Sequence, residues 1–298
     1  MERLHFEDQI AYNKIKSIIL IIAIAVFFVL LGFAISFALD SSYFYFVMAI
    51  SIVFSIGYVL ISYYNSDKIA LASVRAVPAS PVQHRALFNA VENMSLASGM
   101  PMPKLYVMHS AEINAFASGR NPQNAVICVT TGAIEKLNKQ ELEGVVAHEM
   151  SHIANFDIRF MTLVAVMVGM ISIIAQIFLR NLWFSSGRDR ENKNAIFMII
   201  AIAIAILAPI AAQLVSLAIS RKREFTADAT AVKFTRYSPG LRSALEKIKK
   251  EQVSAEEARK YPKAVAPLFI SDPFKKKLQN IFSTHPDIDK RISILKKM

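Results

Sequence analysis

Two histidines four positions apart flank a glutamate in the segment His148-Glu149-Met150-Ser151-His152. On a helix, residues at this spacing project from one face, so both imidazoles can bind one zinc ion while Glu149 reaches a water molecule activated by it. The pattern therefore predicts metal-assisted hydrolysis. It arises by chance in roughly one of two hundred chains of this composition, and the alternative is a pair of surface histidines on an amphipathic helix.

A catalytic zinc ion usually takes three protein ligands, so the two histidines need a further partner. Glu224 and Asp228 are also four positions apart and would share one face of a helix. Glu224 could bind the metal, while Asp228 could accept a hydrogen bond from a ligating imidazole and fix its tautomer. Taken alone, the two residues favour the alternative, an acidic pair that caps a helix or pairs with the neighbouring Arg221, Lys222 and Arg223.

Four long segments without a charged residue lie around these motifs, at 17–39, 41–64, 160–179 and 195–219. Each is long enough to cross the hydrocarbon core of a bilayer at ~1.5 Å per helical residue. Apolar residues make up 54% of the chain, and the mean hydropathy of +0.38 excludes a disordered protein. We therefore predict two membrane-spanning helical hairpins, with buried helices of a soluble protein as the alternative.

The positive charges around the first hairpin predict its orientation. Lys14 and Lys16 precede it, Lys68 and Arg75 follow it, and its turn contains neither Lys nor Arg. By the positive-inside rule, both ends of this hairpin face the cytoplasm. Because the first apolar segment leads directly into the second, we interpret it as a retained helix and not as a cleaved signal peptide.

The second hairpin has a basic turn, which the same rule would place on the cytoplasmic side. This turn contains Arg180, Arg188, Arg190 and Lys193. The hairpin could cross the bilayer twice or enter it without crossing, and the sequence leaves both possibilities open. Either way the segments before and after it lie on one side of the membrane. This parity places Glu224 on the side of His148 and His152, and it favours the metal site over an isolated acidic pair.

The remaining sequence predicts one soluble domain in two parts. Residues 1–64 hold the N-terminal segment and the first hairpin, 65–159 the first part of the domain, 160–219 the second hairpin, and 220–298 the second part. The single cysteine, Cys128, excludes an internal disulfide and a zinc site built on paired cysteines. The fold class is therefore a mainly α membrane protein with two transmembrane helical hairpins and a small sheet in its domain.

Caps and turn residues predict the elements of that domain. A helix is expected between Ser80 as N-cap and Gly99 as stop, and another from Asn138, which has capping-box spacing to Glu141, to about Asn155. Runs of β-forming residues bounded by turn residues predict short strands. The expected ranges are 81–97 and 138–155 for the helices, and 104–108, 113–117 and 125–130 for the strands.

In this order, the motifs resemble the HtpX family of integral-membrane zinc metallopeptidases, which are distant relatives of the CAAX prenyl proteases. The likeness extends over nearly the whole chain, including the predicted hairpins. It is carried by Asn114-Ala115-Phe116-Ala117, His148 to Asn155 with Asp157, Arg223 to Asp228, and Ser283-Thr284-His285-Pro286 with Arg291. The resemblance implies that the domain is an α+β, zincin-like metalloprotease domain.

The resemblance also implies roles for the residues of the metal site. His148, His152 and Glu224 would bind one Zn²⁺ ion per chain. Glu149 would be the general base, and Asp228 would be the acidic residue that supports a ligating histidine.

Further roles are implied for residues outside the two metal-binding segments. His285 would stabilise the oxyanion of the transition state, and Arg291 would support the acidic helix. Asn114, Ala115 and Phe116 would belong to an edge strand that holds the substrate through backbone hydrogen bonds. The alternative for His285 is a residue at the entry to a helix, and for Asn114 an ordinary turn residue.

We expect a membrane-bound zinc endopeptidase of the cell (plasma or inner) membrane, multi-pass and with its active site facing the cytoplasm. The resemblance implies that it cleaves cytoplasm-facing segments of damaged or misfolded membrane proteins, as part of quality control under stress. The expected partners are protein or peptide substrates and membrane lipids, and the net charge of +11 is attributed to anionic lipid and not to nucleic acid. The alternatives are a prenyl-protein (CAAX-type) protease and a non-enzymatic membrane scaffold or transporter. The oligomeric state, regulation and self-cleavage are left open.

Overall fold

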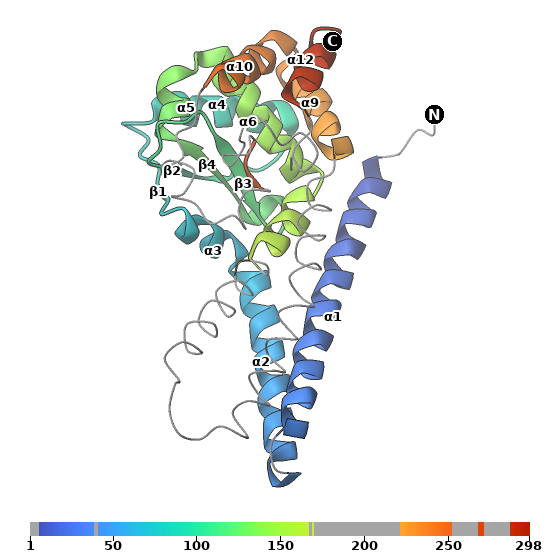
Figure 1. The fold of residues 1–298 in the computed structure, drawn as a ribbon. Coiled ribbons are helices and arrows are strands. Elements are labelled where there is room, and N and C mark those ends of the chain that lie inside the picture. The colour runs from blue at the N-terminus through green and yellow to red at the C-terminus, as the bar shows by residue number, and fades with distance from the viewer. Residues whose placement is uncertain (1–5, 39–40, 167–168, 170–220, 252–267, 271–286) are drawn as a thin grey trace.

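Two long antiparallel helices, joined by a short 3-10 turn, carry a mixed α/β domain at one end (Figure 1). The computed structural model describes residues 6–38, 41–166, 169, 221–251, 268–270 and 287–298. His285 and nearly all of the predicted second hairpin lie outside these residues.

The first hairpin consists of α1 (Phe6–Ala38) and α2 (Phe44–Tyr64), with the turn at Ser41–Tyr43. The Ser55 hydroxyl donates to the Ala25 carbonyl oxygen at 3.1 Å, and the rings of Phe28 and Tyr58 lie 4.7 Å apart between centroids. Through these contacts the inner faces of α1 and α2 pack against each other.

The outer faces of the hairpin remain uncovered. Leu30 is 60% exposed, Phe46 65% and Val53 71%. In a soluble protein such helices would bury their apolar side chains, whereas in a membrane lipid covers them. The prediction of a membrane hairpin is thus confirmed over the stretches Asn13–Phe33 and Phe44–Tyr64.

A four-stranded sheet forms the centre of the domain, in the order β1-β2-β4-β3. Strands β2 and β4 are parallel, and the β1–β2 and β3–β4 pairs are antiparallel. The predicted ranges of β2 and β4 are confirmed, whereas β3 begins two residues later than predicted. The strands are β1 (Val77–Pro78), β2 (Lys104–Met108), β3 (Ala115–Gly119) and β4 (Ala125–Thr130).

Both faces of the sheet are buried at β4, which alternates its side chains between two apolar clusters. Ile127 and Val129 face a cluster with helices α4 (Arg85–Ser98), α6 (Lys139–Ala154) and α10 (Ser238–Lys250). Val126 and Cys128 face the other cluster, which contains residues of α1, of α2, of α3 (Ser66–Ser73) and of the helical stretch 157–166. The sheet therefore lies between the helical layer and the end of the membrane hairpin.

Local caps explain where the first helices of the domain begin and end. The predicted capping box is confirmed: the Glu141 N–H donates to Asn138 Oδ1 at 2.9 Å, and the Asn138 N–H donates to Glu141 Oε2 at 2.8 Å. Helix α4 ends at Gly99, which has a left-handed φ of 69°. It begins at Arg85, four residues after the predicted start, because the Ser80 N–H donates to His84 Nδ1 and closes a separate turn first.

The remaining helices of the domain include α5 (Thr131–Lys136), which follows β4 directly. Two others are α9 (Arg221–Thr235), which packs against α6 and α10, and α12 (Ile288–Leu295), which packs against α9 and α10. Helix α9 lies after the undescribed stretch 170–220, yet it packs against α6.

Helices α6 and α10 cross with their backbones in contact at two glycines. A Cβ on Gly144 would lie 2.5 Å from the Leu241 backbone nitrogen, and a Cβ on Gly240 would lie 2.5 Å from the Gln140 carbonyl oxygen. Because backbone atoms cannot move aside cheaply, any side chain here would push apart the helix that carries the histidines and its neighbour.

We therefore expect Gly144→Ala to lower the free energy of unfolding by about 1–3 kcal/mol, the usual cost of overpacking. Gly57→Ala is the matched control, because Gly57 is also inside a helix but a Cβ added there would meet no described atom within 4 Å. Denaturant unfolding of the detergent-solubilised proteins, followed by circular dichroism, measures both. A Gly144→Ala protein as stable as Gly57→Ala would contradict this explanation of the helix crossing.

Candidate metal centre

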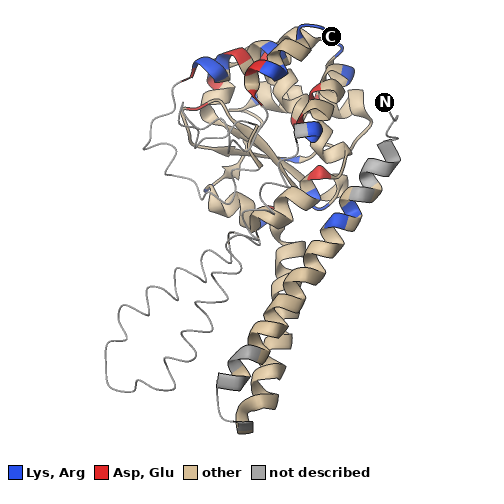
Figure 2. Ribbon diagram, turned by 45° about the vertical axis from the view of Figure 1, so that its right-hand side comes forward, with Lys and Arg blue, Asp and Glu red and all other residues tan. Residues whose placement is uncertain are grey.

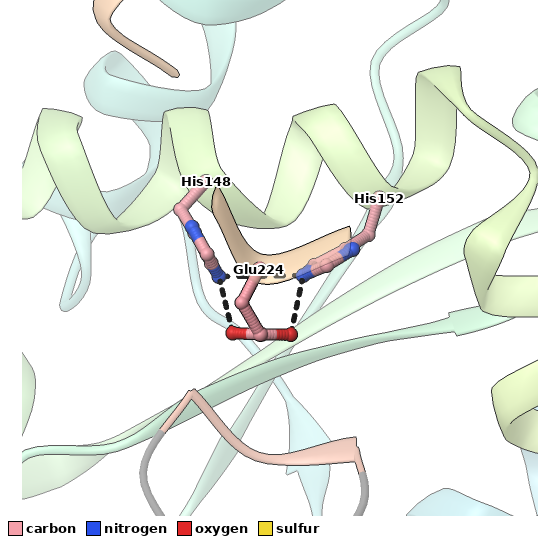
Figure 3. Close-up of side chains that lie close together, drawn as sticks. All are labelled: His148, His152 and Glu224. Atoms are coloured by element: carbon pink, nitrogen blue, oxygen red, sulfur yellow. Dashed lines mark hydrogen bonds and ion pairs between the residues drawn. The ribbon is translucent and has the colours of Figure 1, made fainter. Parts of the chain in front are cut away.

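His148 and His152 lie one turn apart on α6 and point toward the carboxylate of Glu224 on α9 (Figure 3). Their Nε2 atoms are 3.3 Å apart. Glu224 Oε2 lies 3.6 Å from His148 Nε2, and Glu224 Oε1 lies 3.6 Å from His152 Nε2. All three side chains are buried, so the fold brings together the three residues that the sequence predicts as metal ligands.

The other nitrogen of each imidazole faces a second carboxylate. His148 Nδ1 lies 3.0 Å from Asp228 Oδ1, and His152 Nδ1 lies 3.1 Å from Asp157 Oδ2. Because an ionised carboxylate only accepts hydrogen bonds, each Nδ1 carries the proton, and in a neutral ring each Nε2 presents its lone pair. This is the arrangement in which outer carboxylates orient metal-binding histidines.

The donor set fits a divalent cation. Two lone pairs and a carboxylate converge with their acceptor atoms 3.3–3.6 Å apart, and like acceptors at that distance repel unless a cation lies among them. Two atoms that ligate one zinc ion tetrahedrally at ~2.1 Å lie ~3.4 Å apart. Two histidines with one glutamate also form a known ligand set of catalytic zinc, so these three residues could hold the ion.

Asp228 is held by Arg291 from α12. The guanidinium donates through Nε to Asp228 Oδ2 at 2.9 Å and through Nη2 to Asp228 Oδ1 at 2.7 Å. Nη1 also donates to the Ile270 carbonyl oxygen at 3.3 Å and lies 3.4 Å from Glu224 Oε2. Arg291 thus contacts both Asp228 and Glu224, the two acidic residues of α9 that face the site.

The pKa values of His148 and Asp228 reflect the charges of the buried groups around them. Burial alone would raise the pKa of Asp228, but Arg291 and His148 lower it below its ordinary value. Burial and Arg291 act to lower the pKa of His148, yet Asp228 and Glu224 outweigh them and raise it to about 9. Without a metal, Asp228 and Glu224 therefore favour the protonated, positively charged form of His148. A bound cation would replace that positive charge.

Glu149 follows His148 on α6 and is 1% exposed. Burial raises the pKa of its carboxyl group, and the two histidines and a hydrogen bond from the backbone of Ala117 in β3 oppose this increase. A carboxyl group with a raised pKa is suited to accept a proton near neutral pH and to release it again. The site thus has a buried carboxyl group next to the three potential metal ligands, on the side of β3.

The predicted substrate strand is the edge strand β3. Asn114 directly precedes it, and its side-chain oxygen accepts from the Ala115 N–H at 3.0 Å, so Asn114 shapes the entry to the strand. Part of the edge is occupied by the chain itself: Phe116 forms an antiparallel bridge with Phe269, and the Ile270 N–H donates to the Ala115 carbonyl oxygen at 3.0 Å. A substrate strand could not use the Ala115 carbonyl oxygen while Ile270 is bonded to it.

The sequence does not predict the roles of two parts of the site, Asp157 and the stretch 268–270. Asp157 is among the residues that carry the family resemblance, but its spacing of five residues after His152 does not by itself indicate a hydrogen bond across a helix end. The stretch 268–270 carries no motif. Its position at the edge of β3 depends on the folding of distant segments, for which the sequence has no local signal.

The family comparisons agree with this geometry. Residues 81–298 match the family described as Peptidase family M48. A protein named Protease HtpX homolog from Caldanaerobacter subterraneus subsp. tengcongensis is 45% identical over 251 residues, which is 83% of each chain. Another Protease HtpX homolog, from Dictyoglomus thermophilum, is 41% identical over 298 residues, covering 100% of this chain and 96% of its own.

Among solved structures, the crystal structure of S. mikatae Ste24p is similar at a TM-score of 0.45 and 19% identity, covering 96% of this chain and 65% of that protein. The family match and the relatives, together with the exposed apolar hairpin, identify a membrane-bound metallopeptidase. The chain belongs to peptidase family M48 and, within it, to the HtpX family of proteases.

Proposed function

We propose that this protein is a zinc-dependent endopeptidase that binds one Zn²⁺ ion per chain through His148, His152 and Glu224. The observation that carries the proposal is the convergence of three buried side chains from two segments that are distant in the sequence. The two Nε2 atoms lie 3.3 Å apart, and each lies 3.6 Å from one of the two oxygens of Glu224. Carboxylates face the Nδ1 atoms of both imidazoles, so each ring in its neutral form would present the lone pair of its Nε2 atom to the metal.

Each residue of the site has a distinct task in peptide hydrolysis. When bound, the zinc ion supplies Lewis acidity that polarises the scissile carbonyl group and lowers the pKa of a water molecule to about 7. Glu149 accepts the proton of the attacking water at its carboxylate and then donates it to the leaving amine nitrogen. Asp228 and Asp157 keep His148 and His152 oriented.

His285 is proposed, from the family resemblance alone, to oppose the developing oxyanion. Its role would be to donate a hydrogen bond to the former carbonyl oxygen as negative charge gathers there. Asn114, Ala115 and Phe116 are proposed, from the family resemblance, to bind the substrate backbone at β3.

We propose that the site faces the cytoplasm in the cell membrane of a multi-pass protein. The charged residues gather on the domain and on the end of α1 beside it, while the described part of the hairpin away from the domain carries none (Figure 2). At the junction, Lys14 lies over the Phe156 ring at 4.7 Å and Arg159 over the Tyr63 ring at 5.2 Å. Basic residues beside a span favour the cytoplasmic side and anionic headgroups.

The proposed substrates are cytoplasm-facing segments of damaged or misfolded membrane proteins. His148, Glu149 and Glu224 are each at most 3% exposed, so a folded domain cannot reach them, whereas an extended chain could be threaded along β3. A site at the base of a membrane hairpin favours substrates that are themselves anchored nearby.

Glu224→Ala tests the metal assignment. We expect this variant to lose its zinc on dialysis, while the wild type retains one ion per chain, because two histidines alone bind zinc far more weakly than three ligands do. Glu246→Ala, which removes a partly exposed glutamate of α10, is the control and should keep its zinc. Metal analysis of the purified proteins by mass spectrometry gives the result, and full zinc content in Glu224→Ala would refute the third ligand.

A protease assay separates the proposed activity from the alternatives. Casein and a farnesylated peptide are each incubated with the detergent-solubilised protein, with and without a chelator. Cleavage of casein that the chelator abolishes supports the endopeptidase. Cleavage of the farnesylated peptide alone would indicate a prenyl-protein protease, and no cleavage of either would contradict the proposal.

A further inference from the structure

The first membrane helix reaches the metal centre through one buried side chain. Asn13 of α1 is 3% exposed. Its Nδ2 atom donates to Asp157 Oδ1 at 2.8 Å and to the Asn155 carbonyl oxygen at 3.1 Å. The other oxygen of Asp157 faces His152 Nδ1 at 3.1 Å, so a continuous chain of hydrogen bonds runs from α1 to a proposed zinc ligand.

This contact lies at a turn that needs support. Phe156, between Asn155 and Asp157, has a positive φ of 57°, a conformation that costs energy for a residue with a side chain and persists only where the surroundings hold it. Two residues of α1 that follow Asn13 provide such support: Lys14 lies over the Phe156 ring, and Lys16 lies 5.8 Å from the centre of the Phe160 ring. The turn and α1 are therefore docked at several points.

The chemistry of the contact requires an amide. Asn13 uses both hydrogens of its NH₂ group, one on a carboxylate and one on a carbonyl oxygen, and both of these acceptors belong to fully buried residues. Asp157 is 0% exposed, so without Asn13 water could not readily replace the lost donor. The carboxylate would then be free to turn away from His152, because one of its two oxygens would no longer be held.

We propose that Asn13 is a positioning residue of the metal centre. It fixes Asp157, and through Asp157 it fixes the tautomer and the direction of His152. The first membrane helix is then a part of the active site as well as an anchor. This inference rests on the proposed binding of zinc by His148, His152 and Glu224, and it adds a residue from outside the region that matches the M48 family, residues 81–298.

The test measures the affinity for zinc in the full-length, detergent-solubilised protein by competition with a chromogenic chelator. We expect Asn13→Ala to weaken zinc binding about tenfold, the lower end of the range for residues that orient a metal ligand. Ser17→Ala is the matched control: Ser17 is buried one turn further along the same helix, and its hydroxyl donates to the Asn13 carbonyl oxygen of its own helix. The control should bind zinc as tightly as the wild type.

Two further measurements separate positioning from a general loss of stability. In a double-mutant cycle, Asn13→Ala should weaken zinc binding no further once Asp157→Asn is present, because both changes interrupt the same chain of bonds. The rise in melting temperature on adding zinc to the stripped protein should also be smaller for Asn13→Ala than for Ser17→Ala.

Each negative outcome has a distinct meaning. Wild-type zinc affinity in Asn13→Ala would overturn the role of Asn13 and leave the metal centre intact. The same conclusion would follow if the losses of affinity caused by Asn13→Ala and Asp157→Asn simply added in the double mutant. A wild-type protein that binds no stoichiometric zinc would instead refute the proposed function itself.

Discussion

Glu149→Gln is expected to lower kcat/KM for casein by about 10²–10⁴-fold, the usual contribution of a positioned general base. The amide has nearly the shape of the carboxylate but cannot take the proton of the attacking water. Since Glu149 is buried against β3 and its carboxyl pKa is raised, the neutral substitution also removes a costly buried charge. We therefore expect the variant to fold normally and to be at least as stable as the wild type.

Zinc content distinguishes loss of the base from loss of the metal. Glu149→Gln should retain one zinc ion per chain, in contrast to Glu224→Ala, because Glu149 is not one of the three residues whose ligand atoms converge. Initial rates of casein cleavage, measured at equal zinc content, provide the comparison. If the Gln variant cleaved casein as fast as the wild type, Glu149 could not be the general base.

Arg291→Met is expected to destabilise the protein by about 3–5 kcal/mol, the cost of removing one partner from a buried ion pair. Arg291 is 2% exposed and Asp228 1%, and the guanidinium donates two hydrogen bonds to that carboxylate. Without Arg291, Asp228 remains as a buried charge with a neighbouring acid, Glu224. Denaturant unfolding with a chelator present measures this effect without the contribution of bound metal.

Two variants serve as references for Arg291→Met. Arg242→Met removes an arginine that forms a partly exposed ion pair with Glu246 on α10, and it should change the stability by less than about 1 kcal/mol. Combining Arg291→Met with Asp228→Asn should recover much of the loss, because no unpaired charge is then buried at position 228. A single Arg291→Met protein as stable as Arg242→Met would show that the pair contributes little.

Much of the fold could be predicted from short-range signals. The capping box of Asn138 and Glu141 defines the start of α6, and the sequences of β2 and β4 define their own limits, because all of these depend on neighbouring residues. The start of α4 could not be predicted, since the bond from Ser80 to the His84 ring replaces the expected cap. Strand β3 is shifted because its pairing with β4 begins at Ala115 and extends to Gly119.

The proposed site also has some contacts that could be predicted from local sequence and others that depend on tertiary packing. The spacing of His148 and His152, and of Glu224 and Asp228, indicates which residues share a helix face, and membrane parity adds that both helices lie on one side. No such rule connects Asn13 with Asp157 across 144 positions, because their contact depends on how α1 docks against the turn at Phe156. Similarly, the bond of Ile270 to Ala115 follows from tertiary packing alone.

The proposed ligands come from stretches of chain that the ribosome makes at different times. His148 and His152 are made first, more than fifty further residues follow, and only then are Glu224, Asp228 and Arg291 added. Until residue 291 has left the ribosome, the nascent enzyme has an incomplete set of ligands and supports. A protease assembled in this order completes its proposed set of ligands and supports only after the segments that carry Glu224, Asp228 and Arg291 have been added to the chain.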